Sequence, residues 1–318
     1  ASPASASPVL AVGTPPPSVS PATTAPSLSP PNASVVVWGN NTLGTTDVLS
    51  VAMILKKKPI RQIYSTVAAW AALRTDGSVV TWGSSIHGGD STTVASQLLG
   101  SVLTISATDS AFAALKSDGS VVAWGAANLG GTTTSVSSNL IKDVKSLFSN
   151  RYAFAALKIN GEVITWGLPS SGGDSSSVRS ALMRDIQTVF STDAAFVAVP
   201  MPGLGLVPTA WGPKEFGGDS RPVEPMLAVV EAVRDVVSTA KAFALIANTG
   251  QVITWGSSGS GGDSSSVIGQ LGPPVSTIAA TSGAFAALLL DGRVVTWGDP
   301  ALGGDSMTVG DSISTSVV

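Results

Sequence analysis

The sequence predicts an all-β repeat protein, and three observations lead to this class. A Trp-Gly pair recurs every 42 to 45 residues, an aromatic residue stands twelve positions before most of these tryptophans, and short apolar runs flank an Asp-Gly between the two. A fixed period of this length indicates stacked units of supersecondary structure, so seven repeats are expected over residues 34–318. The tryptophans of the repeat are Trp38, Trp82, Trp124, Trp166, Trp211, Trp255 and Trp297.

The clearest copy is the segment 111–125, AFAALKSDGSVVAWG, in which Asp118-Gly119 separates the two apolar runs. Asp-Gly in this position favours a β-hairpin because glycine tolerates the positive φ angle that such turns require. Phe112 and Trp124 place one aromatic residue in each strand. A hairpin this short cannot bury both of its faces alone, so neighbouring repeats are expected to cover them.

A further strand is expected before each hairpin, because an apolar residue such as Ile105 stands seven positions before the first aromatic residue. After the tryptophans, apolar residues such as Val94 and Leu98 lie four and eight positions beyond an aspartate. This spacing fits one capped helical turn, and a bent strand fits nearly as well. Each repeat therefore holds three strands or four. The aspartates of the Gly-Gly-Asp-Ser motif are Asp90, Asp174, Asp219, Asp263 and Asp305.

Residues 1–33 are rich in Pro, Ser, Ala and Thr, a composition that predicts an extended arm without a packed core. Asn32 and Asn40 begin acceptor sequons, which makes them candidate sites of N-glycosylation. Together with the Ser-Pro steps of the arm, the sequons favour an exported, extracellular or cell-surface protein. An organelle lumen or the cytoplasm is the alternative.

The two ends of the chain are expected to complete one shared repeat. Residues 34–39, SVVVWG, form the second half of a hairpin whose first half is missing, and the chain ends soon after the last Gly-Gly-Asp-Ser motif. Joining the ends on paper brings Val9 to Val12 near the place of the missing strand. We therefore expect the N-terminal and C-terminal segments to close a ring of repeats.

One hairpin departs from the pattern. Phe196 and Trp211 are fifteen residues apart, and the loop between them carries three prolines in place of Asp-Gly. Proline cannot donate a hydrogen bond to a β-ladder, so the tip of this hairpin is expected to be exposed or irregular. This segment is the predicted contact loop, with Pro200, Met201, Pro202, Leu204 and Leu206 as its candidate contact residues.

Composition excludes several classes of function. A formal net charge of −3, with scattered Lys and Arg, argues against a nucleic-acid surface. No apolar run reaches the roughly 18 residues of a membrane span. His87 is the single histidine, and the motif aspartates recur too far apart to build a stacked calcium site. We expect no catalytic residue, cofactor or metal, and a turn or helix cap is the expected role of the aspartates.

With hairpin, Trp-Gly pair and period in place, the chain resembles the RCC1 / BLIP-II superfamily of β-propellers. The repeat signature of that superfamily is matched by ALKSDGSVVAWG at residues 114–125 and by its copies across residues 34–318. The Gly-Gly-Asp-Ser variant is similar to RCC1-like arrays of some bacterial and protist proteins. The resemblance implies a seven-bladed propeller, whereas function is not implied because members share only the scaffold.

The leading hypothesis is a non-enzymatic scaffold, structural or binding other proteins, within a larger assembly. The arm and the irregular loop at 199–209 are its expected contacts, because binding loops on rigid scaffolds are common. One alternative is a carbohydrate or small-ligand binder at the central channel of the propeller. Another is an inhibitor of a secreted hydrolase similar to BLIP-II. An enzyme would require Asp and Glu residues that converge at one opening.

Overall fold

The computed structural model describes residues 58–272 and 274–306, which form two compact units, residues 58–142 and residues 143–306. Trp38, the sequon residues Asn32 and Asn40, the arm and the segment from Val9 to Val12 lie outside the described residues. The seventh repeat and the closure of a ring therefore stay predictions. Six repeats fall within the described part of the chain, two in the first unit and four in the second.

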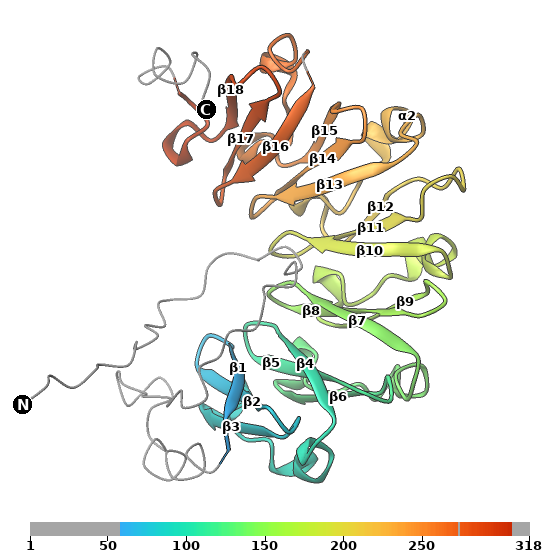
Figure 1. Ribbon diagram of the computed structural model, residues 1–318, viewed down its shortest axis with the longest axis vertical. Coiled ribbons are helices and arrows are strands. Elements are labelled where there is room, and N and C mark those ends of the chain that lie inside the picture. The colour runs from blue at the N-terminus through green and yellow to red at the C-terminus, as the bar shows by residue number, and fades with distance from the viewer. Residues whose placement is uncertain (1–57, 273, 307–318) are drawn as a thin grey trace, which may run out of the picture. The chain divides into compact units, whose positions relative to one another are not determined.

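The first unit contains two three-stranded sheets (Figure 1). Its strands are β1 (Ile60–Ser65), β2 (Ala69–Arg74) and β3 (Val79–Gly83), then β4 (Val102–Ala107), β5 (Ala111–Lys116) and β6 (Val121–Gly125). Short 3-10 helices follow each sheet: η2 (Ser85–His87) and η3 (Thr92–Leu98) after β3, and η4 (Ala127–Leu129) and η5 (Ser137–Asn139) after β6. The expected helical turn after each tryptophan is thus of the 3-10 type in this unit.

The second unit contains four more sheets of the same kind. Its strands are β7 (Val144–Ser149), β8 (Ala153–Lys158), β9 (Val163–Gly167), β10 (Ile186–Ser191), β11 (Phe196–Pro200), β12 (Thr209–Trp211), β13 (Val233–Ser238), β14 (Ala242–Ala247), β15 (Val252–Gly256), β16 (Val275–Ala280), β17 (Ala284–Leu289) and β18 (Val294–Gly298). The 3-10 helices are η6 (Pro169–Ser171), η7 (Ser176–Leu182), η8 (Lys214–Phe216), η9 (Arg221–Val223), η10 (Ser258–Ser260), η11 (Ser265–Val267) and η12 (Pro300–Leu302). The described residues include one α-helix, α2 (Glu224–Leu227), so the fold is all-β and its six sheets fit a β-propeller.

Each sheet is an antiparallel meander in which the middle strand pairs with both neighbours. In the turn between β5 and β6, Gly119 has a φ of 76° and Lys116 N–H donates to the Ser120 carbonyl at 2.9 Å. Asp118 Oδ1 accepts from Ser120 N–H at 2.9 Å. The positive φ explains why glycine recurs here, because other residues adopt it at a cost.

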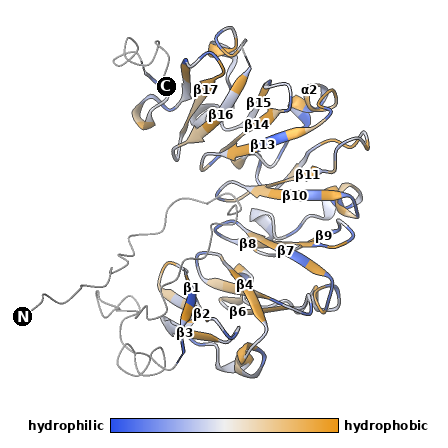
Figure 2. Ribbon diagram, viewed as in Figure 1, coloured by the Kyte–Doolittle hydropathy of each residue, from blue (hydrophilic) through white to orange (hydrophobic). Residues whose placement is uncertain are grey.

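Both faces of a middle strand are buried, since successive side chains point to opposite faces of a sheet. In β14, Ala242, Ala244 and Ile246 belong to the apolar cluster shared with β16–β18. Phe243 and Leu245 belong to the cluster shared with the preceding sheet, β10–β12. The small alanine face of one sheet thus receives the aromatic face of the next, and hydrophobic residues run along the strands accordingly (Figure 2).

The repeated tryptophan packs within its own sheet and forms a hydrogen bond to the preceding repeat. Trp255 stacks on Phe243 of its own sheet with ring centroids 5.3 Å apart. Its indole Nε1–H donates to the carbonyl of Gly217, six residues after Trp211 in the preceding repeat, at 3.0 Å. Within each unit the same indole bond is made by Trp124 to Gly88, Trp211 to Gly172 and Trp297 to Gly261.

A polar side chain, buried in every described repeat except at Thr281, ties the start of each hairpin to the helical turn that follows the hairpin. Thr192 Oγ1 donates to the Phe216 carbonyl at 2.8 Å and accepts from Ala195 N–H at 3.1 Å. Asn150 makes the equivalent bond with its side-chain amide, which donates to the Ser171 carbonyl at 2.8 Å. These bonds satisfy polar groups that burial would otherwise leave costly. Threonines at the equivalent position are Thr66, Thr108, Thr239 and Thr281.

Candidate functional site

The irregular hairpin lies in the second unit, where Pro200 ends β11. In the regular repeats the residue at this position donates its N–H to the carbonyl four residues ahead, as Lys116 does to Ser120 and Lys158 to Glu162. Proline has no N–H, so this bond, which closes the Asp-Gly turn, cannot form at Pro200. The chain instead crosses to β12 through residues 201–208, which we call the β11–β12 loop.

The strand pairing of this hairpin is also shorter than in the regular repeats. Strands β11 and β12 pair over three residues, ending at Ala198 and Thr209, whereas β14 and β15 pair over five. The loop is held at its ends: Met201 N–H donates to the Asp185 carbonyl at 2.8 Å, and Thr209 Oγ1 donates to the Val207 carbonyl at 3.1 Å. Between these anchors, the N–H groups of residues 203–207 donate no hydrogen bond to the described part of the chain.

The tip of the loop is exposed over six consecutive residues, 201–206. Met201, Leu204 and Leu206 are 42%, 52% and 47% exposed, while Pro200 and Pro208 at the base are buried. Large apolar side chains held out on a loop with free backbone donors offer both apolar contact and hydrogen bonds to another chain. Four of the five predicted contact residues thus lie at the surface, and Pro200 supports them from within.

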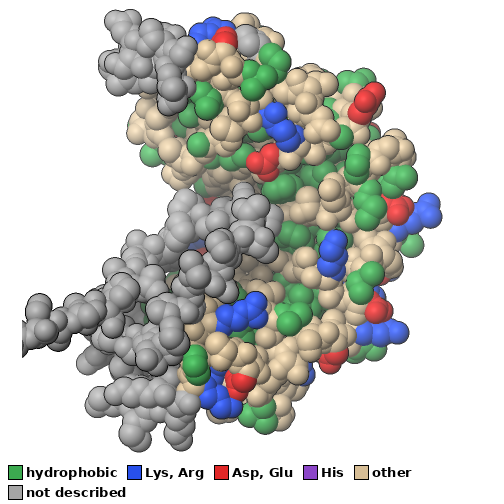
Figure 3. All heavy atoms as spheres, in the orientation of Figure 1, with side chains coloured by type: hydrophobic (Ala, Val, Ile, Leu, Met, Phe, Trp, Pro, Cys, Tyr) green, Lys and Arg blue, Asp and Glu red, His purple; other side chains and the backbone are tan. Residues whose placement is uncertain are grey.

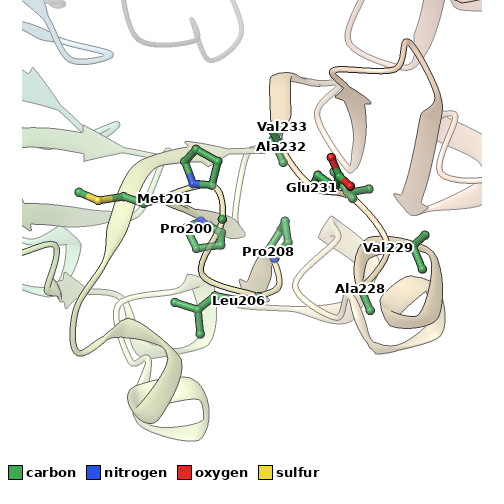
Figure 4. A pocket seen from close by; sticks show the side chains of 13 residues that line it. Pro200, Met201, Leu206, Pro208, Ala228, Val229, Glu231, Ala232 and Val233 are labelled. Atoms are coloured by element: carbon green, nitrogen blue, oxygen red, sulfur yellow. The ribbon is translucent and has the colours of Figure 1, made fainter.

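A groove of about 550 Å³ runs along one side of the loop. The β11–β12 loop forms one wall, and the segment 228–233, which leads from α2 into β13, forms the other (Figure 4). The groove is lined by apolar residues and glycines apart from Glu231. Val229, in the second wall, and Met226, three residues before it in the sequence, are 72% and 45% exposed.

The second wall was not predicted, although the sequence contained a signal for it. Leu182 and Val189 are seven residues apart, and so are the equivalent pairs of most repeats, but Leu227 and Val236 are nine apart. This insertion and the longer hairpin belong to adjacent repeats. In the second unit, two segments are longer than the equivalent segments of the regular repeats, and both line the same groove.

A second groove, of about 470 Å³, lies at the C-terminal end of the loop and shares Pro208 with the first. Charged residues line it. Arg221 Nε and Nη2 each donate to an Asp219 carboxylate oxygen at 2.8 Å. This guanidinium holds the pKa of Asp219 below its usual value. Lys214 and Glu224 complete the charged lining, so the second groove offers both signs of charge.

Most of the other residues that the sequence analysis singled out lie in the hydrophobic core or form hydrogen bonds within turns. The repeat tryptophans at 82, 124, 166, 211, 255 and 297 are at most 3% exposed. Asp90 Oδ1 accepts from Thr92 N–H at 2.9 Å at the start of η3, and Asp174, Asp219 and Asp263 accept from the N–H two residues ahead in the same way. Asp305 is exposed.

His87 Nδ1 lies 2.8 Å from Ser84 Oγ within its own turn. In residues 58–272 and 274–306 no three His, Cys, Asp or Glu side chains are grouped so as to hold a metal ion. Lys and Arg are scattered singly over the face shown in Figure 3, with uncharged surface between them. None of the helices in the described segments is long and apolar enough to cross a membrane.

Comparison of the sequence with protein-family models and with curated proteins finds no match. Comparison with solved structures finds Prp20p of Saccharomyces cerevisiae, at 16% identity and a TM-score of 0.45, with 75% of this chain and 72% of that chain covered. Human WBSCR16 is similar at 16% identity and a TM-score of 0.44, with 78% and 79% covered.

The ectodomain of the Physcomitrella patens receptor kinase CR4 is similar at 15% identity and a TM-score of 0.44. The match covers 76% of this chain and 62% of that ectodomain, so the chain spans about three fifths of its length. Prp20p is yeast RCC1.

Proposed function

We propose that this protein is a non-enzymatic interaction scaffold, a component of a larger assembly, and that the β11–β12 loop with its two grooves binds a partner protein. The observation that carries the proposal is the meeting of the two longer-than-repeat segments of the second unit, 201–208 and 228–233, at one apolar groove. Regular repeats are explained by packing. Two irregular segments from different repeats that line the same surface are better explained by a contact with another protein.

The chemistry of the site suits a polypeptide partner. Met201, Leu204 and Leu206 offer exposed apolar side chains beside an apolar groove, and such patches mark interaction surfaces on soluble proteins. The free N–H groups of residues 203–207 can donate to main-chain carbonyls, and the second groove adds charges of both signs at the rim. An apolar centre with a polar rim is the usual anatomy of a protein interface.

The test compares partners captured by the full chain and by a loop variant. Replacing residues 200–210 with KSDGSVVA, the sequence of residues 116–123, restores the regular hairpin and removes the apolar tip. We expect the captured partner, identified by mass spectrometry, to be lost from this variant. The variants Ile159→Ser and Leu290→Ser, which change residues 70% and 68% exposed at regular turns, should retain it.

Equal capture by the full chain and the loop variant would contradict this site. The arm is the second proposed contact, and deleting residues 1–33 tests it separately. If the deletion alone abolished capture, the scaffold proposal would stand and the loop would be the wrong surface. The predicted export and the glycosylation of Asn32 and Asn40 belong to the same proposal, and peptide mapping of the native protein tests them.

A further inference from the structure

Both walls of the apolar groove carry main-chain N–H groups that have no acceptor in the part of the chain that the structure describes. On the loop side these are the N–H groups of residues 203–207. On the opposite wall they are the N–H groups of Val229, Glu231 and Ala232. A ligand that displaces water from both walls must offer acceptors on two sides, because a buried N–H without a partner is costly.

An extended polypeptide meets this requirement. In a β-strand the main-chain carbonyls point alternately to the two edges, so a single segment can accept hydrogen bonds from both walls. A helix cannot do so, because its carbonyls, apart from those of the last turn, accept hydrogen bonds within the helix. Recognition of an extended peptide through main-chain hydrogen bonds, with pockets for alternate side chains, is a recurring mode of protein binding.

The charge of the groove adds a second requirement. Glu231 is the single charged residue that lines it, and this residue is exposed at the second wall (Figure 4). Glu231 forms no ion pair with the described residues of the chain. The side chain of Arg234, three positions further on, donates instead to the Val275 carbonyl at 2.6 Å. An apolar groove with one unpaired carboxylate is complementary to an apolar ligand that carries one cationic group.

We propose that the groove binds an extended segment of the partner protein that places one Lys or Arg against Glu231. This inference rests on the proposed function and adds the chemistry of the partner to it. Successive side chains of a strand alternate between its two faces, so the residues two positions before and after the basic residue also face the groove. We expect apolar residues there, packed against side chains of the two walls such as Leu206 and Val230.

The experiment selects ligands for the full chain from a phage-displayed library of random dodecapeptides. Counter-selection on the loop variant, which carries KSDGSVVA in place of residues 200–210, removes peptides that bind elsewhere on the molecule. We expect the enriched peptides to share a Lys or Arg with apolar residues two positions away on both sides. A fluorescein-labelled synthetic copy of an enriched peptide then gives the Kd by fluorescence anisotropy.

Charge reversal tests the ion pair. Glu231→Lys should raise the Kd of this peptide by about tenfold or more, because repulsion replaces attraction, and a selection on that variant should enrich Asp or Glu at the basic position. Glu231→Gln removes the charge alone and should raise the Kd by a smaller factor. Glu215→Lys is the matched control, since this exposed residue of η8 lines neither groove, and it should leave the Kd unchanged. Far-UV circular dichroism checks that the variants are folded.

Transferred nuclear Overhauser effects report the backbone of the bound peptide. Strong effects from Hα to the next amide proton indicate an extended chain, whereas effects between successive amide protons indicate a helix. The proposal is overturned if no peptide is enriched, if the bound peptide is helical, or if Glu231→Lys leaves the Kd unchanged. In each of these cases, loss of the captured partner from the loop variant would still support the proposed function, whereas equal capture by the two chains would contradict the site itself.

Discussion

At the scale of single residues, the glycine six positions after each tryptophan is constrained twice. Gly217 has a φ of +86°, and a Cβ there would lie 2.8 Å from the Phe243 ring. We expect Gly217→Ala to lower the free energy of unfolding by about 2 to 4 kcal/mol, because left-handed backbone strain and overpacking add. Urea titration followed by tryptophan fluorescence measures the loss.

A matched glycine separates the two effects. Gly203 has a φ of +81° and no atom within 4 Å of an added Cβ. Gly203→Ala should therefore lose only the backbone part, about 1 kcal/mol. If both variants lost the same free energy of unfolding, the close approach of the added Cβ at position 217 to the Phe243 ring would have no effect on stability.

At the scale of elements, the three strands of each repeat could be predicted from the sequence, but the details at the strand ends could not. Asp118-Gly119 predicted its turn because glycine and aspartate have distinctive backbone chemistry. The bond from the Trp255 indole to the Gly217 carbonyl was invisible, because every residue has a carbonyl and its direction depends on the folded backbone. The prolines at 200, 202 and 208 predicted an irregular contact loop, which forms one wall of the groove. The groove itself and its second wall, at the insertion before Val236, were not predicted.

The irregular hairpin leads to a prediction of stability. Replacing residues 200–210 with KSDGSVVA gives the end of β11 a lysine N–H and lets β12 pair over five residues, as β6 does with β5. Each net hydrogen bond contributes about 1 kcal/mol, so we expect the unfolding free energy to rise by about 1 to 2 kcal/mol. A differential scanning calorimetry trace with a raised Tm supports this. A lowered Tm would mean that the loop itself stabilises the repeat.

At the scale of the whole molecule, hydrogen bonds to aspartate carboxylates recur along the chain, and their effects on stability add. Within residues 58–272 and 274–306, seven aspartates have a pKa below the usual value, and in each the main cause is a hydrogen bond to the carboxylate. Backbone N–H groups are the main donors at Asp90, Asp174 and Asp263, and the Ser120 hydroxyl is the main donor at Asp118. Lys58, Arg221 and Arg293 are the main donors at Asp76, Asp219 and Asp291.

These lowered pKa values predict how the stability of the protein depends on pH. A carboxylate with a lower pKa in the folded state stabilises the fold above the unfolded value, about 3.9 for aspartate, and loses that effect as the pH falls through its folded pKa. We therefore expect the Tm, followed by circular dichroism, to stay level above about pH 5 and to fall below about pH 4 as the carboxylates protonate.

Salt distinguishes this cause from simple charge repulsion at low pH. The 17 Lys and Arg residues repel one another once the carboxylates are neutral, and about 0.5 M NaCl screens that repulsion. Hydrogen bonds between residues two positions apart are not screened, so most of the fall in Tm should remain in salt. The triple variant Asp90→Asn, Asp174→Asn, Asp263→Asn should show a smaller fall than the wild type. If salt abolished the fall, or if the triple variant matched the wild type, the repeated aspartate turns would not be the source of the acid sensitivity.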